Sequence, residues 1–591
     1  MKKSLLLIST LLITPHVVAQ NSYTLSGYIY DANDSESLVG AAIYIPSMEQ
    51  GVATNVYGFY SLTVRVPVIE LKISYLGYES ISRSVDLREV DNLDFYMEEK
   101  VQELGEDIVV SAEGFELREQ VNSTSMGKVA IKPREVSIIP TIGGEADLLK
   151  VAQLTPGVTS GNEGTIGFFV RGGTDDQNLV LLDEAAVYNV GHLFGFFSVF
   201  NTDAIKDIDL VKGAFPSRYG GRLSSIMDIR MKEGSLQKYN MNGGVGLLTS
   251  RFTADGPIVK DKSSFMVSGR RTYIDQVFGL VGVELPYYFY DLNAKLNVKL
   301  SDRDRLYFSS YFGDDVLSLN STTSDTTDDG GEVTEDLGFG FRLGNFTSSV
   351  RWNHVYENDK LFSNITLHQT RFSYDIEGDF VDNSLLIKSN IQDFGLTGDW
   401  QYFQSVGNQY SFGTQFIYHN FRPNVTNTSG DISEFLESNP SQRIPTTEIA
   451  LYGSNEREIS SRLKVNIGLR LSFSTTDDTL YFGPEPRLAF RYKINERNSF
   501  KGSYSLMRQY IHRVSSSSIA LPTDLWYPVT RTVLPQRSDL LAAGFTHIIP
   551  RYNLSLSLEG YYKGMDNLIE YREGANLILN DNFERELLNG T

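Results

Sequence analysis

The feature that most constrains this chain is a period-two alternation of apolar and polar side chains in its second half. Residues 463–473 place every apolar side chain on one face of a strand and every polar or small one on the other. Residues 410–416, 488–494 and 552–562 repeat the pattern. A wall that meets lipid on one side and water on the other requires this alternation. The sequence therefore predicts a transmembrane antiparallel β-barrel over residues 236–591.

The amino-acid composition disfavours several other classes of protein. A soluble β-sandwich also alternates, but it does not need aromatic residues near so many strand ends, and the 591 residues include 33 Tyr and 34 Phe. No hydrophobic run reaches the roughly 18 residues of a membrane-spanning helix. The formal net charge of -20 leaves no basic face for nucleic acid. The absence of Cys from the sequence excludes disulfides, thiolate metal sites, a cysteine nucleophile and a lipidated N-terminal cysteine.

Three short motifs occupy residues 169–234. In order, they are Arg171, Gly172 and Gly173; the apolar run 179–182 with Asp183; and a turn with Tyr219, Gly220 and Arg222. Paired glycines mark sharp turns and close backbone approach, and a four-residue apolar run is typical of a short strand buried on both faces. Together, the motifs resemble the plug domain of TonB-dependent outer-membrane receptors. The resemblance implies a small α/β plug over residues 114–235 inside a barrel of the 22-stranded type.

The N-terminal region predicts an exported protein. Lys2 and Lys3 precede an apolar run and small residues, so residues 1–19 are predicted to be a secretory signal peptide. Residues 22–97 contain short β-type segments separated by turn residues. They resemble the carboxypeptidase-regulatory-like β-sandwich that precedes the plug in one branch of the family. That domain is a non-catalytic appendage, and this segment has no His/Glu zinc set, so no enzyme is predicted here.

A charged linker over residues 98–113 ends in a β-branched segment. The segment consists of Asp107, Ile108, Val109, Val110, Ser111 and Ala112. It resembles the family's TonB box, a short strand that adds itself to the edge of a partner's sheet. The alternative interpretation is an ordinary first strand of the plug. The position after a linker and before the plug favours the TonB box, which implies a TonB-type energising protein as partner.

Two loops of the plug are the candidate ligand-binding region. Residues 147–154 predict a short helix stopped by a Pro-Gly pair. The resemblance implies that the loops over 159–167 and 188–197 form the plug apex, where the family contacts its cargo. The second loop supplies the candidate ligand-binding residues Tyr188, Asn189, His192 and Phe194. Alternatively, these side chains pack against the barrel wall or one another. Neither loop carries an arginine cluster, which disfavours a highly anionic cargo.

A long polar insert over residues 319–336 fits an extracellular loop. Its carboxylates, among them Asp328, match no defined calcium-loop spacing, so a solvated acidic tip is favoured over a calcium site. The sequence predicts no metal site and no cofactor.

Length sets one further expectation. A 22-stranded barrel needs on the order of 480 residues, whereas the segment from 236 to 591 accommodates about 16 strands. The last residues also lack the aromatic-terminated strand of outer-membrane barrels. The sequence therefore predicts a barrel truncated at the C-terminus, with a smaller natural barrel as the alternative.

Taken with the resemblance, these features predict an importer of a scarce nutrient in the outer membrane of a Gram-negative cell, with its N-terminal domain in the periplasm. The cargo is an iron chelate, an oligosaccharide, a peptide or a vitamin. The alternative hypothesis is that the chain is a receptor or scaffold of a surface complex. Its β-sandwich would then dock a partner protein, and the complex would include a surface lipoprotein. A surface hydrolase is disfavoured because the sequence offers no paired-carboxylate or Ser/His constellation.

Overall fold

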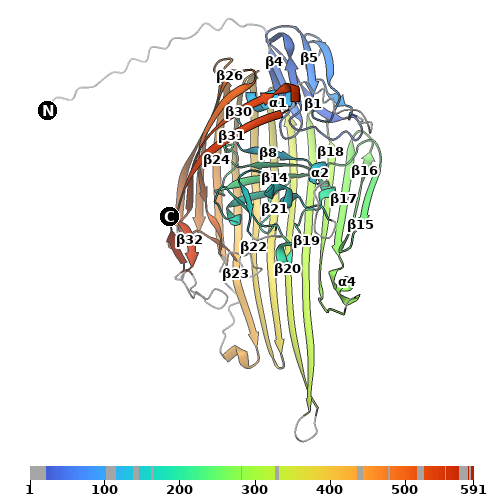
Figure 1. The fold of residues 1–591 in the computed structure, drawn as a ribbon, viewed down its shortest axis with the longest axis vertical. Helices are drawn as coiled ribbons and strands as arrows, with labels where there is room; N and C mark the ends of the chain where they lie inside the picture. Colours follow the sequence, from blue (N-terminus) through green and yellow to red (C-terminus); the bar gives the residue numbers. More distant parts are fainter. Residues whose placement is uncertain are drawn as a thin grey trace, which may run out of the picture.

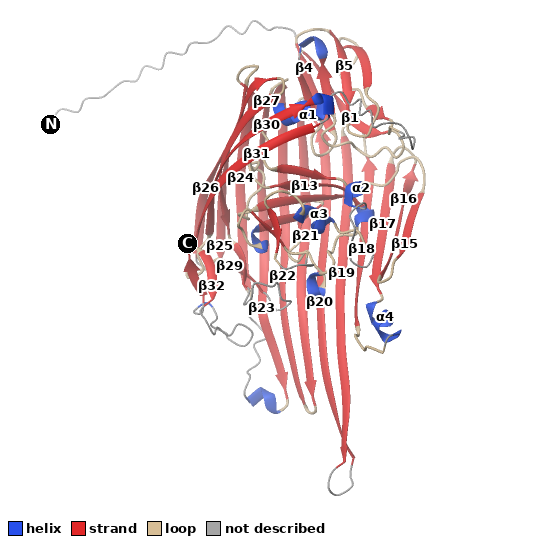
Figure 2. Cartoon of the chain, viewed as in Figure 1, coloured by secondary structure: helices blue, strands red, loops and turns tan. Residues whose placement is uncertain are grey.

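The chain folds into a small β-sandwich, a plug and a large curved β-sheet that surrounds the plug (Figures 1 and 2). The computed structural model describes residues 22–48, 50–100, 115–136, 145–161, 166–280, 282–326, 332–434, 443–476, 479–514, 525–552, 554–571, 584 and 587–590. The predicted signal peptide (1–19), the predicted TonB box (107–112) and Asp328 lie outside these residues. The predicted domain boundaries remain predictions.

The β-sandwich consists of a three-stranded and a four-stranded sheet. The first has the order β4 (Phe59–Val64), β1 (Tyr23–Asp31), β7 (Phe95–Met97), and the second has the order β3 (Gln50–Ala53), β2 (Ala42–Ile45), β5 (Val68–Ser74), β6 (Ile81–Asp86). Alternate residues of each strand form a shared core that includes Leu25, Ile43, Leu62 and Leu71. This arrangement follows from the period-two pattern of the segment.

The plug is built on a five-stranded mixed sheet. Its order is β12 (Ala185–Ala186), β11 (Asn178–Leu182), β14 (Ser225–Met231), β13 (Ile205–Val211), β8 (Lys128–Ile131). The other plug elements are α1 (Phe115–Asn122), α2 (Pro133–Val136), α3 (Leu148–Gln153) and the hairpin of β9 (Val158–Ser160) and β10 (Phe168–Val170). The helix predicted over residues 147–154 is present, with the Asp147 side chain capping its first turn.

The surrounding wall is a 15-stranded antiparallel meander. Its strands are β15 (Asn240–Val245), β16 (Thr249–Val259), β17 (Ser263–Thr272), β18 (Tyr287–Lys299), β19 (Asp304–Thr326), β20 (Glu332–Val355), β21 (Leu361–Phe380), β22 (Asn383–Ser405), β23 (Asn408–Ser429), β24 (Ile444–Glu458), β25 (Leu463–Thr476), β26 (Thr479–Asn495), β27 (Asn498–Gln509), β30 (Gln536–Ile549) and β31 (Leu554–Asp566). Within the described strands, β15 and β31 form the two edges of this sheet. Helix α4 (Ile274–Leu280) lies between β17 and β18.

Two short hairpins complete the architecture. One consists of β28 (Ile511–Val514) and β29 (Leu525–Pro528), and the other of β32 (Leu568–Tyr571) and β33 (Leu587–Gly590). The β-sandwich lies at one end of the wall, and α4 and the long β19–β20 hairpin extend toward the other end (Figure 1).

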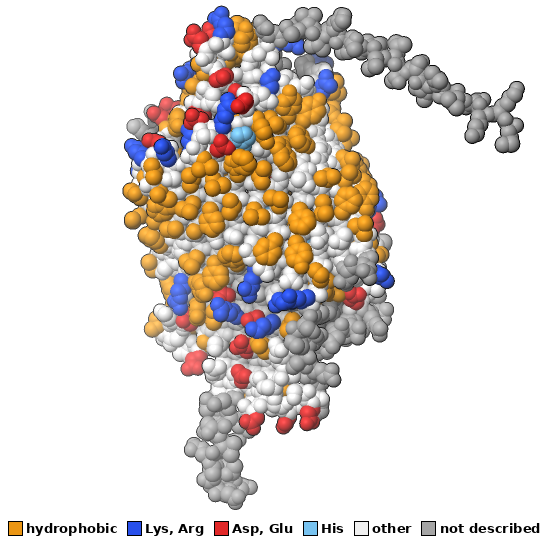
Figure 3. Space-filling view, turned by 180° about the vertical axis from the view of Figure 1, so that it is seen from behind, with side chains coloured by type: hydrophobic (Ala, Val, Ile, Leu, Met, Phe, Trp, Pro, Cys, Tyr) orange, Lys and Arg blue, Asp and Glu red, His pale blue; other side chains and the backbone are white. Residues whose placement is uncertain are grey.

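The predicted alternation is confirmed in the wall. In β25, Gly468, Arg470 and Ser472 are buried on the inner face, whereas Ile467 and Leu469 are exposed on the outer face. On the face that Figure 3 shows, hydrophobic side chains form a broad belt across the middle of the outer surface, with charged side chains toward both ends. No helix among the described residues is long and apolar enough to cross a membrane. The predicted fold class, a β-sandwich, a plug and a large antiparallel barrel sheet, is confirmed.

Candidate cargo site at the plug apex

The signature aspartate of the plug connects it to the wall. Asp183 is buried directly after β11 and accepts hydrogen bonds from Lys295 Nζ (3.0 Å) and Ser309 Oγ (2.7 Å), which lie on β18 and β19. Its φ of 45° is unusual for a residue with a side chain. The two wall contacts therefore hold both the side chain and a strained backbone in place.

The arginine and glycines of the signature also have structural roles. Arg171 Nη2 donates to Glu559 Oε2 of β31 at 2.9 Å. A Cβ atom on Gly220 would lie 2.3 Å from Arg470 Nε, and one on Gly173 would lie 2.3 Å from Ser224 Oγ. Gly172 has a φ of +76° and marks a sharp turn. At Gly220 the third motif thus brings the backbone close to the wall, as paired glycines predict.

The third motif makes one contact within the plug and places one residue near the plug apex. Tyr219 donates from its hydroxyl to Asp228 Oδ2 at 2.9 Å, within the plug. Arg222 lies near the apex, with its guanidinium carbon 5.1 Å from the Trp526 ring centroid and 5.9 Å from that of Tyr188. Arg222 therefore lies beside Tyr188 of the candidate ligand-binding loop.

Two of the four candidate ligand-binding residues are buried against the wall. Tyr188 donates from its hydroxyl to Asp393 Oδ2 of β22 at 2.5 Å and packs edge-on against Trp526, with ring centroids 4.9 Å apart. His192 lies between two wall carboxylates, with Nδ1 2.9 Å from Asp315 Oδ2 and Nε2 3.1 Å from Asp291 Oδ2. These placements correspond to the packing alternative stated for both side chains.

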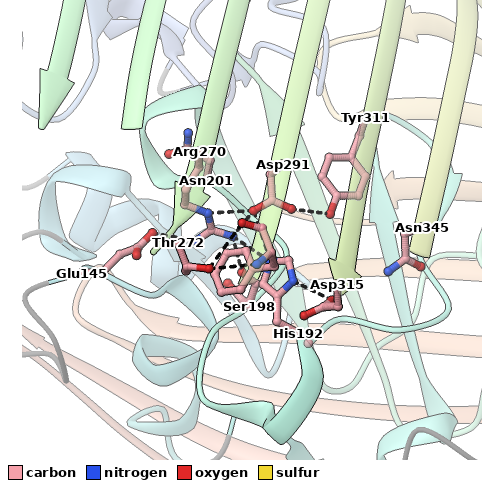
Figure 4. A network of polar contacts seen from close by, with 12 residues as sticks. Glu145, His192, Ser198, Asn201, Arg270, Thr272, Asp291, Tyr311, Asp315 and Asn345 are labelled. Atoms are coloured by element: carbon pink, nitrogen blue, oxygen red, sulfur yellow. Dashed lines mark hydrogen bonds and ion pairs between the residues drawn. The ribbon is translucent and has the colours of Figure 1, made fainter. Parts of the chain in front are cut away.

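His192 belongs to a buried network that joins three parts of the molecule (Figure 4). Its ring stacks on Phe289 with centroids 3.5 Å apart. Arg270 of β17 donates to Asp291 Oδ2 (2.8 Å), to Glu145 Oε1 (2.6 Å) and to the carbonyl oxygen of Ser198 (2.6 Å). The network therefore connects the segment before α3, the apex loop and the wall.

The network controls the protonation of His192. Burial favours the neutral ring, but Asp291 and Asp315 outweigh burial and raise the pKa of His192 to about 9. Arg270 Nη2 lies 3.2 Å from His192 Nε2 and opposes the added charge, although Asp291 neutralises this guanidinium. The ring is therefore cationic at neutral pH, with an N-H directed at each carboxylate.

We predict that the contribution of His192 to the free energy of unfolding falls as the pH rises from 6.5 to 9.5. Because the folded protein holds the His192 proton more tightly than the unfolded chain, its stabilisation is complete below the ordinary pKa of 6.5 and is lost through about pH 9. The contribution is on the order of 3 kcal/mol. Urea unfolding of the wild type and of His192→Gln at a series of pH values measures this contribution as the difference between the two. His192→Gln, which cannot become cationic, should remove most of this dependence; an unchanged pH profile would contradict the assignment.

The other two candidates lie nearer the surface of the apex. Asn189 is partly buried; its side chain donates to the carbonyl of Gly191 at 2.7 Å, and its own carbonyl accepts from Asn345 Nδ2 at 3.0 Å. Phe194 is 50% exposed, has a φ of +71° and packs edge-on against Tyr287. Of the four candidates, Phe194 therefore presents the most surface to a ligand.

A pocket of about 130 Å³ lies at this apex. Its lining includes all four candidates together with Phe169, Arg222, Arg513 and Trp526. Sequence reasoning missed Arg513 and Trp526, which come from the hairpin of β28 and β29. This hairpin packs on the apex, where Ile511, Val514 and Trp526 join one apolar cluster with Tyr188 and Leu193. Its only sequence signal is a break in the barrel alternation between β27 and β30.

Charges around the pocket are balanced. Arg513 pairs with Asp175, and Gln509 Nε2 donates to Asp176 Oδ2 at 3.2 Å. Arg222 lies beside aromatic rings. Among the described residues, no group of three or more His, Asp or Glu side chains is placed to hold a metal ion. The pocket therefore combines aromatic surface with both signs of charge.

Comparison with known families identifies the protein class. The model described as "TonB dependent receptor-like, beta-barrel" matches residues 271–582. The chain belongs to the TonB-dependent receptor family. The TonB-dependent receptor plug domain matches residues 142–225 of this receptor, and the CarboxypepD_reg-like domain matches residues 25–110. The family is one of the outer membrane, and its members work with TonB and bind small-molecule cargo.

Solved structures share the fold of this TonB-dependent receptor. The siderophore receptor PirA from Acinetobacter baumannii is 15% identical, with 78% of this chain and 73% of that chain covered and a TM-score of 0.56. A mutant of the ferric enterobactin receptor PfeA from Pseudomonas aeruginosa is also 15% identical, with 78% and 74% covered and a TM-score of 0.56. PirA from Pseudomonas aeruginosa is 14% identical, with 76% and 77% covered and a TM-score of 0.55. No curated protein matches the chain.

Proposed function

We propose that this receptor imports a scarce nutrient across the outer membrane, driven by a TonB-type protein that pulls on residues 107–112. The observation that supports this most is the apex pocket, where the plug loop and the β28–β29 hairpin meet. Cargo binds here, and displacement of the plug then releases it toward the β-sandwich end. The β-sandwich would then face the periplasm. No covalent chemistry is required, so we propose a transporter and not an enzyme.

The pocket favours a cargo with an apolar or aromatic group and a low net charge. Tyr188, Phe194 and Trp526 supply ring surface, which commonly dominates binding energy. The nearby arginines are matched by carboxylates or rings, so the site lacks the excess positive charge that a highly anionic cargo requires. An iron chelate, an oligosaccharide, a peptide and a vitamin each remain classes to test. The structures of siderophore receptors share the fold only, so they do not select among these classes.

A direct-binding screen tests the proposed site. The full-length protein in detergent micelles is titrated with representative iron chelates, oligosaccharides, peptides and cobalamin. We expect measurable affinity for at least one low-charge compound that carries a ring or an apolar group. Binding only to highly charged anions would contradict the proposed cargo class.

The aromatic anchors can then be tested with the tightest compound of the screen. Trp526→Ala and Tyr188→Ala should each weaken binding by about 1 to 3 kcal/mol, the range for aromatic anchors. Phe308→Ala, on the outer face of β19, is the control and should leave affinity unchanged. If both apex variants assemble normally and bind the compound with wild-type affinity, Trp526 and Tyr188 contribute to packing and not to ligand binding. His192→Ala tests, in the same assay, the prediction that the His192 side chain contacts the ligand.

The alternative function is a surface-complex scaffold. In that case the β-sandwich would dock another protein, a surface lipoprotein would be one partner, and transport would be secondary. Uptake that depends on the energising protein separates the two hypotheses, because a scaffold has no need for it.

A further inference from the structure

One face of the β-sandwich is an aromatic surface that contacts the end of the barrel. Side chains of β1 alternate, so that Leu25 and Ile29 enter the sandwich core while Tyr28 and Tyr30 point the opposite way. Tyr28, Tyr30, Tyr57 and Phe59 form a buried cluster with Val355, Phe362 and Phe403 of the wall. Phe59 stacks on Phe362 with centroids 5.1 Å apart and is fully buried. This contact resembles a domain core more than a transient interface.

Polar contacts surround the aromatic cluster. Ser61 Oγ donates to the carbonyl of Asp359 (2.6 Å), and Asn55 Nδ2 donates to Gln401 Oε1 (3.0 Å). The Arg305 guanidinium lies over the Tyr28 and Tyr30 rings and donates to the Tyr30 hydroxyl. These hydrogen bonds pair polar groups of the β-sandwich with polar groups of the wall, which favours a stable contact.

The same domain reaches the plug. Tyr57 donates from its hydroxyl to Glu184 Oε1 at 2.7 Å. Glu184 also accepts from Asn364 Nδ2 at 3.0 Å and lies 3.7 Å from Arg218 of the plug. One carboxylate thus connects the β-sandwich, the wall and the plug. Although burial favours the neutral acid, Arg218 and Arg351 together with the hydrogen bonds from Thr366 and Tyr57 hold the pKa of Glu184 below its ordinary value.

At Asp183 and Glu184 the chain carries residues that suit their side-chain contacts and not residues that suit the backbone conformation of the turn. Asp183 and Glu184 form the two-residue turn between β11 and β12, with φ values of 45° and 73°. Positive φ at both positions is typical of a type I′ turn, which prefers Asn-Gly. The chain instead places two carboxylates there, and each binds groups outside the plug sheet. The turn is therefore a strained corner held by its contacts.

A second group of polar contacts joins the β-sandwich to the plug and to the segment that follows β14. Glu233 accepts from Ser37 Oγ (3.1 Å) and pairs with Lys206 of the plug (3.3 Å). Glu36 Oε1 accepts from the backbone amides of Glu233 (2.7 Å) and Gly234 (3.1 Å). The domain therefore contacts the plug and wall at two separated points.

We propose that the β-sandwich is a fixed brace: it stays docked on the end of the barrel and holds the Glu184 corner of the plug against the wall through Tyr57. The aromatic face is then occupied within the chain, and any external partner must use another face of the domain. The proposal concerns the resting receptor and does not depend on the cargo.

Thiol labelling tests whether the domain stays docked. Because the sequence contains no Cys, each variant of the full chain, purified in detergent micelles, carries a single thiol. Ser61→Cys and Ser26→Cys report on the docked face, where both serines are buried. Ser82→Cys is the exposed control and Ala41→Cys the core control. We expect a polar maleimide to label both docked-face positions roughly 100-fold more slowly than Ser82→Cys. Labelling of both at the rate of Ser82→Cys would overturn the brace.

Hydrogen exchange tests whether the contact between Tyr57 and Glu184 stabilises this corner of the plug. Tyr57→Phe removes only the hydroxyl that reaches Glu184, whereas Tyr60→Phe removes one that donates to Leu93 inside the β-sandwich (2.8 Å). We expect Tyr57→Phe to speed exchange of the Asp183 and Val187 amides, which are hydrogen-bonded in the plug sheet, about fivefold. Tyr60→Phe should leave these amides unchanged. Equal exchange rates in the two variants would overturn the proposed role of Tyr57, whatever the labelling result.

Discussion

Val109→Pro is expected to abolish energised uptake while cargo affinity stays at its wild-type value. Proline removes a backbone donor and prevents regular strand pairing, and pairing with a partner's sheet edge is the proposed use of residues 107–112. Binding at the apex does not involve this segment, so affinity should not change. Whole-cell uptake and a binding titration of the purified protein measure the two quantities.

Val109→Ile is the matched control for this experiment. It keeps a β-branched side chain and the backbone N-H, so uptake should stay close to wild type. Uptake by Val109→Pro at the wild-type rate would show that residues 107–112 are an ordinary plug strand or linker. Loss of binding together with uptake would instead indicate that the substitution disturbs the plug.

Arg270→Ala is expected to destabilise the receptor by about 3 to 5 kcal/mol, the range for leaving buried charges without their partner. The Arg270 side chain is 1% exposed and compensates Asp291 and Glu145, which are equally buried. Its loss also frees the carbonyl of Ser198 in the apex loop. Urea unfolding and protease resistance of the plug should both report the change.

Arg271→Ala provides the comparison. Arg271 is the next residue of β17, is exposed on the outer face and lies over the Tyr288 ring at 4.8 Å. Its removal should change stability by less than about 1 kcal/mol. Similar stabilities of Arg270→Ala and Arg271→Ala would show that the buried network contributes little to holding the plug.

Local patterns were sufficient to predict most of the fold. The alternation of residues 463–473 predicted the two faces of β25, and residues 23–31 form the first of the short strands expected within residues 22–97. Asp147 and the Pro-Gly pair bounded the predicted helix. These features depend on side-chain periodicity and capping over a few residues, which a single sequence displays directly.

The candidate site was less predictable because its contacts are long-range. His192 is an isolated histidine in the sequence, whereas its partners Asp291 and Asp315 lie 99 and 123 residues away. Trp526 and Arg513 reach the apex only because the β28–β29 hairpin packs on the plug, and no local period encodes that placement. Asp183 was recognised from a motif, but its pairing with Lys295 depends on how the plug sits in the wall.

The most direct test of the account is whole-cell uptake of the tightest compound from the binding screen, in paired strains that have or lack the TonB-type protein. We predict accumulation only in the strain with the energising protein, while the receptor in both strains binds the compound equally. Equal accumulation in the two strains would contradict active import. Binding without accumulation in either strain would favour the surface-complex scaffold.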